Sequence, residues 1–156
     1  MSEALATHNT MPPTSVEYLE KLCAVEQKVR EMKQITVQTE HVLHAGMYAR
    51  TVRLDANVLI VGVLIKRPTM LVVRGSAWVF AGERWYVING YNVIPASAGR
   101  KQMYVTAAPT EITMMFPTKA KTVEEAEAEF TDEPDNLISR KSEDDLIVIT
   151  GDVCQE

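Results

Sequence analysis

Two histidines stand three residues apart in this 156-residue sequence, in the pattern Glu-His-x-x-His from Glu40 to His44. On a helical turn, this spacing would allow both imidazoles to bind one metal ion. On an extended segment, the two rings would point to opposite sides. The order differs from the His-Glu-x-x-His motif of zinc proteases, and the pattern precedes a strand-like run instead of lying in a helix. We therefore expect structural or surface roles for His41 and His44, ahead of an interface, ligand or metal role.

Cations and tyrosines are the other side chains that could hold a ligand. Two basic clusters flank turns, one at 66–69 and one at 99–102. If both clusters lie at one barrel mouth, they could bind a small anion through charge-assisted hydrogen bonds. Cations that alternate with apolar residues on strands also commonly point to solvent, and these clusters could equally pair with the acidic segment of a neighbouring subunit. The candidate ligand-binding residues are Tyr48, Arg50, Lys66, Arg100 and Tyr104.

No pattern in the sequence indicates an enzyme. Ser97 lies in a loop of small residues, but the Gly-x-Ser-x-Gly pattern of a nucleophile elbow is absent. The sequence has no phosphate-binding loop and no dinucleotide fingerprint. We therefore expect no catalytic residues and no cofactor. Basic and aromatic residues do not alternate densely, so nucleic acid is not an expected partner.

Short runs rich in valine, isoleucine, tyrosine and threonine recur from Val37 to Pro117, about ten residues apart, and turn residues separate them. Such spacing is typical of a sandwich or a jelly-roll barrel. The sequence therefore predicts a mainly β fold, with a single jelly-roll barrel over 37–118. The predicted strands are 47–54, 58–65, 69–74, 76–80, 84–88, 91–94, 101–106 and 110–116.

An N-terminal helix is predicted over 14–36, after a disordered leader at 1–13. Thr14 and Glu17 have the spacing of a capping box. An apolar stripe follows in heptad-like steps, and a helix this short must bury its stripe against other parts of the protein. The stripe could pack on its own barrel or pair between subunits. The candidate interface residues are Tyr18, Leu22, Val25, Val29 and Met32.

The carboxyl-terminal segment, 119–156, is predicted to hold a short helix and an acidic tail. Thr122 and Glu125 form a second capping box, and Phe130 is placed to anchor the helix to the barrel. The segment contains more than half of the acidic residues and a quarter of the basic ones, which is typical of a solvated segment or a contact with a basic surface. The β-prone run Leu146 to Thr150 could add a strand to a sheet edge, in this subunit or in a neighbour.

Targeting and redox signals are few. Cys23 and Cys154 are far apart in the sequence and form no CxxC pair, so a reduced, cytosolic context is expected. The first 13 residues lack the apolar core of a signal peptide, and the longest apolar runs have strand length. We expect no membrane association.

Four segments carry a family resemblance: EHVLHAGMYARTVRL, GVLIKRPTMLVVRGSAWVF, GYNVIPASAGRKQMYV and FPTKAKTVEEAEAEFTDE. Together they resemble the cupin-like proteins that are widespread in the genomes of tailed bacteriophages and prophages. The resemblance covers residues 39–140, and HAGMYAR, LIKRPT and PASAGRKQ are its most specific pieces. It implies a cupin-like barrel and a phage origin. It implies no activity, because members generally have none assigned.

Metal-binding cupins place two histidines and a glutamate on one strand pair and a further histidine on a later strand. Here the first of these regions spans Gly62 to Gly75 and has Leu64 to Thr69 where the ligands would be expected, and the second ends in Phe116-Pro117-Thr118. No histidine follows His44 in the sequence. A metal ion in the barrel is therefore not expected.

Two functions from different classes are the main hypotheses, and a third, an enzyme such as a metal-free sugar isomerase, lacks a visible acid and base pair. The first is a non-enzymatic structural or assembly protein of a phage, which would act through homo-oligomerisation and contacts with other virion proteins, in the host cytoplasm or in the virion. The lost metal ligands, the heptad-like helix and the β-prone terminal run support it. The alternative is a protein that sequesters a small anionic ligand in the barrel cavity. An interior lined throughout by apolar side chains would argue against the alternative.

Overall fold

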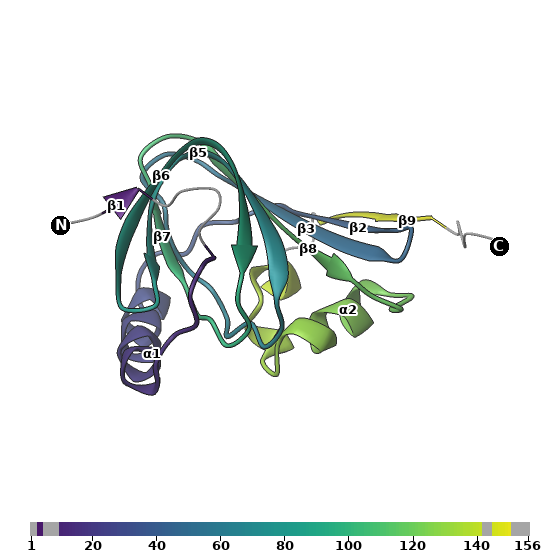
Figure 1. Ribbon diagram of the computed structural model, residues 1–156, viewed down its shortest axis with the longest axis horizontal. Coiled ribbons are helices and arrows are strands. Elements are labelled where there is room, and N and C mark those ends of the chain that lie inside the picture. The colour runs from purple at the N-terminus through teal and green to yellow at the C-terminus, as the bar shows by residue number, and fades with distance from the viewer. Residues whose placement is uncertain (1–2, 5–9, 142–144, 151–156) are drawn as a thin grey trace.

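The computed structural model describes residues 3–4, 10–141 and 145–150. The strands pair in the order β1-β6-β5-β8-β3-β2-β9, and a short β4–β7 ladder branches from β5. Figure 1 shows that this sheet curls into an arch, with helix α1 below one end and helix α2 below the other. The strands are β1 (Glu3–Ala4), β2 (Thr39–His44), β3 (Met47–Leu54), β4 (Leu59–Val61), β5 (Thr69–Ala81), β6 (Arg84–Ala96), β7 (Met103–Thr106), β8 (Thr110–Pro117) and β9 (Leu146–Ile149).

The long strand β5 belongs to both halves of the arch. Its first half, from Met70 to Arg74, pairs with β8, and its second half, from Ala77 to Phe80, pairs with β7. Strand β6 pairs with β5 along its whole length. The change of partner occurs at Gly75, which has a φ of +143°, and a Cβ added there would lie 2.5 Å from Oγ1 of Thr110. Glycine therefore allows the bend and the close approach of β8.

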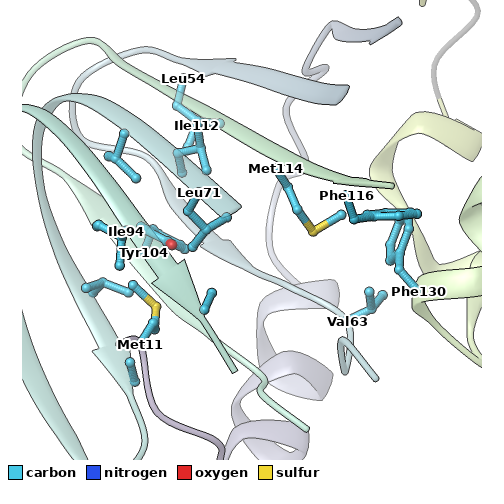
Figure 2. Packing of buried hydrophobic residues seen from close by; sticks show 14 of the residues in the cluster. Met11, Leu54, Val63, Leu71, Ile94, Tyr104, Ile112, Met114, Phe116 and Phe130 are labelled. Carbon is cyan, nitrogen blue, oxygen red and sulfur yellow. The ribbon is translucent and has the colours of Figure 1, made fainter. Parts of the chain in front are cut away.

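The hydrophobic core fills the space inside the arch. Alternate residues of β5 and β8 point inward, among them Leu71, Val73, Ile112 and Met114. Figure 2 shows Leu71 close to Ile94 of the neighbouring strand β6 and to Tyr104 of β7, with Met11 below them. The alternation of buried and more exposed positions that predicts a strand is thus the pattern that builds the core.

Helix α1 (Val16–Arg30) begins at Ser15, whose side chain accepts a hydrogen bond from the Tyr18 amide. It packs on its own barrel, the first of the two arrangements that the sequence allows. Leu22 is buried, and the ring of Tyr18 lies 5.6 Å from that of Phe80. Of the candidate interface residues, Val25 and Val29 are half-buried and Met32 is exposed. Whether Met32 contacts a second copy stays a prediction.

Helix α2 (Val123–Phe130) covers the other end of the core. It begins at Thr122, which accepts a hydrogen bond from the Glu125 amide, as the capping box predicts. Phe130 is fully buried, and its ring lies 5.9 Å from that of Phe116. The anchor role of Phe130 is therefore confirmed, and Figure 2 shows the two rings side by side. Two 3-10 turns follow, η1 (Pro134–Asn136) and η2 (Ile138–Lys141).

The expected fold class is confirmed: the chain is mainly β, with a curled barrel-like sheet, an N-terminal helix and a short C-terminal helix. Several details differ from the sequence prediction, and one of them is the strand predicted over 58–65, which extends only from Leu59 to Val61. Strands 69–74 and 76–80 are one bent strand, and so are 84–88 and 91–94, because β-pairing continues through Gly75 and Gly90. The segment 39–44 is also a strand. The helix predicted over 14–36 is shorter at both ends.

The amino-terminal boundary of the barrel also differs. Residues 1–2 and 5–9 of the predicted leader lie outside the described residues, but Met11 is completely buried in the core. Its amide donates to the Pro95 carbonyl at 2.7 Å, and its carbonyl accepts from the Ser97 amide at 3.0 Å. The packed domain therefore includes Met11. The acidic tail at 151–156, with Cys154, lies outside the described residues.

Candidate ligand cavity

A cavity of about 820 Å³ lies inside the arch, and residues at the carboxyl end of α1 line part of it. Its walls are mostly aliphatic and aromatic, with Val63, Leu71, Ile112, Met114 and Phe130 among them. Cavities of this volume are typical of sites for small organic molecules. The interior is therefore not filled completely by side chains, and its polar residues decide what it can hold.

Arg100 is the most unusual of these polar residues. Its side chain is 1% exposed, and no carboxylate pairs with it within the described ranges. Its guanidinium donates to the Ser97 carbonyl at 2.8 Å and to Oγ1 of Thr69 at 2.6 Å, and its Nε–H has no acceptor. Burial lowers the pKa of Arg100 to about 10. The cavity wall thus carries a desolvated cation with an unused donor.

Gln102 and Tyr104 share the wall with Arg100. The three residues alternate along one extended segment, so their side chains point to the same side. The Tyr104 hydroxyl donates to Oε1 of Gln102 at 3.1 Å, and both side chains are buried. Burial raises the pKa of Tyr104, so its phenol stays neutral. Between them, Lys101 points the other way, and its Nζ lies 2.7 Å from Oε2 of Glu26 on α1.

The charge around the cavity is predominantly positive. Among the described residues that line it, Glu26 alone is acidic, and it pairs with Arg30 and Lys101. The lining cations are Arg30, Lys33, Arg50, Arg100 and Lys141. Arg50 is compensated by Glu127 at 3.4 Å. The excess of positive charge favours an anion in the cavity.

The structure brings three of the five candidate ligand-binding residues to the cavity. Arg50, Arg100 and Tyr104 line it. Tyr48 and Lys66 do not: Tyr48 is packed against Phe116 and Phe130, and Lys66 is exposed and pairs with Asp132 at 2.7 Å. The basic cluster at 66–69 was a candidate partner for the acidic segment of a neighbouring subunit, and here Lys66 and Arg67 pair with Asp132 and Glu129 of their own chain.

Sequence reasoning missed Gln102 as a lining residue. The signal was present, because Arg100, Gln102 and Tyr104 alternate in a strand-like run, and a strand that buries the first and third of them also buries the second. The two turn clusters, whose proximity the sequence left open, lie in contact. The Arg100 guanidinium donates to Oγ1 of Thr69 at 2.6 Å and to the Arg67 carbonyl at 3.4 Å.

His41 and His44 lie on strand β2 and face opposite sides, which is the extended alternative. His41 is buried, whereas His44 is exposed. Nε2 of His41 donates to Asp145 at 3.1 Å, so its Nδ1 accepts the hydroxyl proton of Tyr48 at 2.7 Å. Burial lowers the pKa of His41, although Asp145 acts in the opposite direction. Burial also raises the pKa of Tyr48 to about 12. This network is a satisfied structural cluster.

The cavity does not fit a divalent metal ion. A cupin-type site needs imidazole and carboxylate donors, but the described lining offers the single carboxylate of Glu26, already paired, and two buried guanidinium groups. No group of three histidine, cysteine or acidic residues suited to a metal occurs among the described residues. Of the two helices within the described ranges, neither is long and apolar enough to cross a membrane.

No protein-family model matches this sequence, and no curated protein matches it either. Solved structures of similar shape include a cupin superfamily protein from Desulfitobacterium hafniense (7% identity, 56% of this chain and 83% of that chain, TM-score 0.44). A cupin 2 conserved barrel domain protein from Salinispora arenicola is 9% identical (71% and 92%, TM-score 0.44). The cupin domain of Schizosaccharomyces pombe Cnp3 is 14% identical (68% and 81%, TM-score 0.43). Likenesses this distant support no statement about ligand, activity or partner.

Proposed function

We propose that this protein binds a small anionic molecule in its barrel cavity and acts by holding that molecule, without catalysing a reaction on it. Arg100 carries the proposal, because its guanidinium is buried at the cavity wall with an unused Nε–H and no carboxylate partner within the described ranges. Burial of an uncompensated charge is unfavourable. An anion in the cavity would supply the missing partner.

The mixture of polar and apolar side chains in the cavity walls restricts the class of ligand. Beyond Arg100, Gln102 and Tyr104, the cavity is lined largely by side chains such as Leu71 and Ile112. A molecule with one acidic group and an apolar body would match both parts, because the acid would reach Arg100 and the body would displace water from the aliphatic wall. Because Arg100, Gln102 and Tyr104 line it, the cavity is not entirely apolar, and an entirely apolar interior would have argued against binding.

Thermal unfolding with small anions tests the proposal. Octanoate, benzoate and adenosine monophosphate differ in the size and polarity of the body attached to the anion. A ligand at a hundred times its dissociation constant should stabilise the fold by about 2.7 kcal/mol. The Arg100→Met variant should keep its fold and lose this shift. The Lys66→Met variant, which removes an exposed cation outside the cavity, should keep it. The absence of any shift, or equal shifts in the wild type and Arg100→Met, would contradict the proposal.

A second candidate function, that of an assembly or structural protein of a tailed phage, is favoured by apolar side chains on the outer face of the arch. Met70, Tyr91 and Val93 are 41%, 67% and 37% exposed on the paired strands β5 and β6. Such residues commonly contact other proteins. The protein would then act through homo-oligomerisation and contacts with other virion proteins.

The second candidate is tested in purified phage particles. Quantitative mass spectrometry should find the protein at a fixed copy number relative to the major capsid protein. Its presence only in the lysate, and not in particles, would argue for the cavity-binding function instead.

A further inference from the structure

A second concave site lies between helix α1 and the turn that joins β5 to β6. This aromatic notch has a volume of about 630 Å³, and Figure 1 shows the turn beside α1. Four of its seven lining side chains are aromatic, and both tryptophans of the sequence are among them. The aromatic residues are Tyr18, Trp78, Phe80 and Trp85. The chemistry of the notch is therefore unlike that of the largely aliphatic cavity inside the arch.

Strand alternation places these rings on the outer face of the sheet. Trp78 and Phe80 alternate along β5 with the buried Val79, so both point outward. Trp85 lies opposite Phe80 in the β5–β6 ladder, and the centroids of these two rings are 5.4 Å apart. The ring of Tyr18 packs on Phe80 from α1. Trp78 is nevertheless 43% exposed, so α1 does not cover the rings completely.

Glu83 supplies a carboxylate at the rim of the aromatic notch. Its side chain is exposed in the β5–β6 turn, and it forms no ion pair with any other described residue. Arg84 also contributes to the lining, but its guanidinium lies 5.4 Å from the centroid of the Tyr86 ring, and its Nε donates to the Tyr86 hydroxyl at 3.1 Å. Tyr86 alternates with Trp85 along β6 and faces the other side. The notch therefore combines ring faces, which attract cations, with an acid that has no ion-pair partner within the described ranges.

An ammonium group of the protein itself already lies on one of these rings. Nζ of Lys21 is 4.5 Å from the centroid of the Tyr18 ring. The same Nζ donates to Oε1 of Glu17 at 2.9 Å, so α1 holds this cation at its own surface, and the ring of Trp78 stays exposed. A lysine ammonium is strongly hydrated, whereas a quaternary ammonium group is weakly hydrated and donates no hydrogen bond. The open rings therefore favour a quaternary cation over a second lysine.

We propose that the aromatic notch binds a small organic cation that carries a quaternary ammonium group, as choline does. The methyl groups of the cation contact the rings of Trp78 and Trp85, and the carboxylate of Glu83 balances its charge. The volume of the notch lies within the range of small-molecule sites. Among the described residues, none lines both the notch and the barrel cavity. Binding of the cation is therefore independent of the anion that Arg100 is proposed to hold.

Two ligands of the same shape separate the effect of charge from that of apolar contact. One is choline, and the other is its neutral isostere, the alcohol in which a tert-butyl group replaces the trimethylammonium group. Tryptophan fluorescence reports on the notch directly, because both tryptophans of the sequence line it. In titrations of the full chain, choline should bind about fivefold or more tightly than the alcohol. Equal affinities, or no fluorescence change with choline, would overturn the inference.

Two substitutions assign the attraction to particular side chains. Trp78→Leu keeps an apolar side chain but removes the ring, so choline should lose most of its advantage over the alcohol, with Trp85 as the remaining reporter. Glu83→Gln should weaken the binding of choline and leave that of the alcohol unchanged. The matched controls Tyr91→Leu and Glu20→Gln, which change an exposed ring and an exposed acid outside the notch, should bind choline like the wild type. Unchanged choline binding in either Trp78→Leu or Glu83→Gln would contradict the proposed site.

Discussion

The guanidinium of Arg50 and the carboxylate of Glu127 form a buried ion pair that joins strand β3 to helix α2, with Nη1 3.4 Å from Oε2. Oγ of Ser139 lies between them, accepting from Arg50 at 2.9 Å and donating to Glu127 at 2.8 Å. Nε of Arg140 donates to the second carboxylate oxygen at 2.8 Å. One carboxylate therefore holds α2 and η2 against the sheet.

Removal of this carboxylate should destabilise the protein strongly. Glu127→Ala leaves the Arg50 cation buried without a partner, so the free energy of unfolding should fall by about 3–5 kcal/mol. Urea denaturation measures the change. Glu124→Ala, which removes an exposed acid from the first turn of the same helix, should cost less than about 1 kcal/mol. Similar costs for the two variants would show that the buried pair contributes no more than a surface charge.

The protein should become less stable as the pH is lowered, because of His41. Its folded pKa lies below the ordinary value of 6.5, so the unfolded chain binds a proton at higher pH than the folded chain does. The contribution of neutral His41 is complete above 6.5 and is lost as the pH falls through 6.5 toward the folded pKa. The free energy of unfolding of the wild type should therefore decrease more steeply over this range than that of His41→Gln. His44→Gln, at the exposed position of the same strand, is the matched control.

Gly75 and Gly90 face each other across the β5–β6 ladder and allow a matched comparison. An added Cβ at Gly75 would meet Oγ1 of Thr110 at 2.5 Å and the Pro109 carbonyl at 2.6 Å, whereas at Gly90 it would meet nothing within 4 Å. Gly90→Ala carries only the cost of a left-handed backbone, about 1–2 kcal/mol. Gly75→Ala should cost clearly more in thermal or chemical denaturation. A smaller loss at Gly75 would show that β8 can move away without penalty.

Met11 and Met32 test where the packed domain begins. Met11 is completely buried and Met32 is 63% exposed. Met11→Ala should lower the free energy of unfolding by about 2–5 kcal/mol, the usual cost of a methionine cavity. Met32→Ala should change it by no more than about 0.5 kcal/mol. Equal small effects on the urea midpoint would place residue 11 outside the cooperative unit.

The strand-rich fold followed from sequence periodicity, because the alternation in β3 and β8 reflects one buried face directly. Strand β2 was missed, since its residues read as a possible metal motif, and only the pairing with β3 settles their extended form. The burial of Met11 had no local signal, because it follows from a distant hydrogen-bond pairing with Pro95 and Ser97. Turn residues such as Gly75 were read as strand ends, although they bend a continuous strand.

The candidate site was predicted in part for a similar reason. Arg100 and Tyr104 were chosen for their charge and hydroxyl, and alternation could have added Gln102. Lys66 and Arg50 looked equivalent in sequence, but Arg50 points inward to Glu127 and Lys66 points outward to Asp132. The difference depends on which residues of α2 and of the segment after it lie nearby, and this is set by tertiary packing that a local pattern does not contain.

The pairing of β5 with both β8 and β7 restricts how a molecule bound in the cavity could exchange with solvent. Because this strand is bonded to β6 on one edge and to β8 and β7 on the other, the arch cannot open along it without loss of most of its hydrogen-bonded framework. The lining also includes Val29 and Met32 at the end of α1 and Leu137 between the two 3-10 turns, outside this hydrogen-bonded framework. A bound molecule would therefore enter and leave the cavity between the end of α1 and the turns after α2, where side chains form the wall.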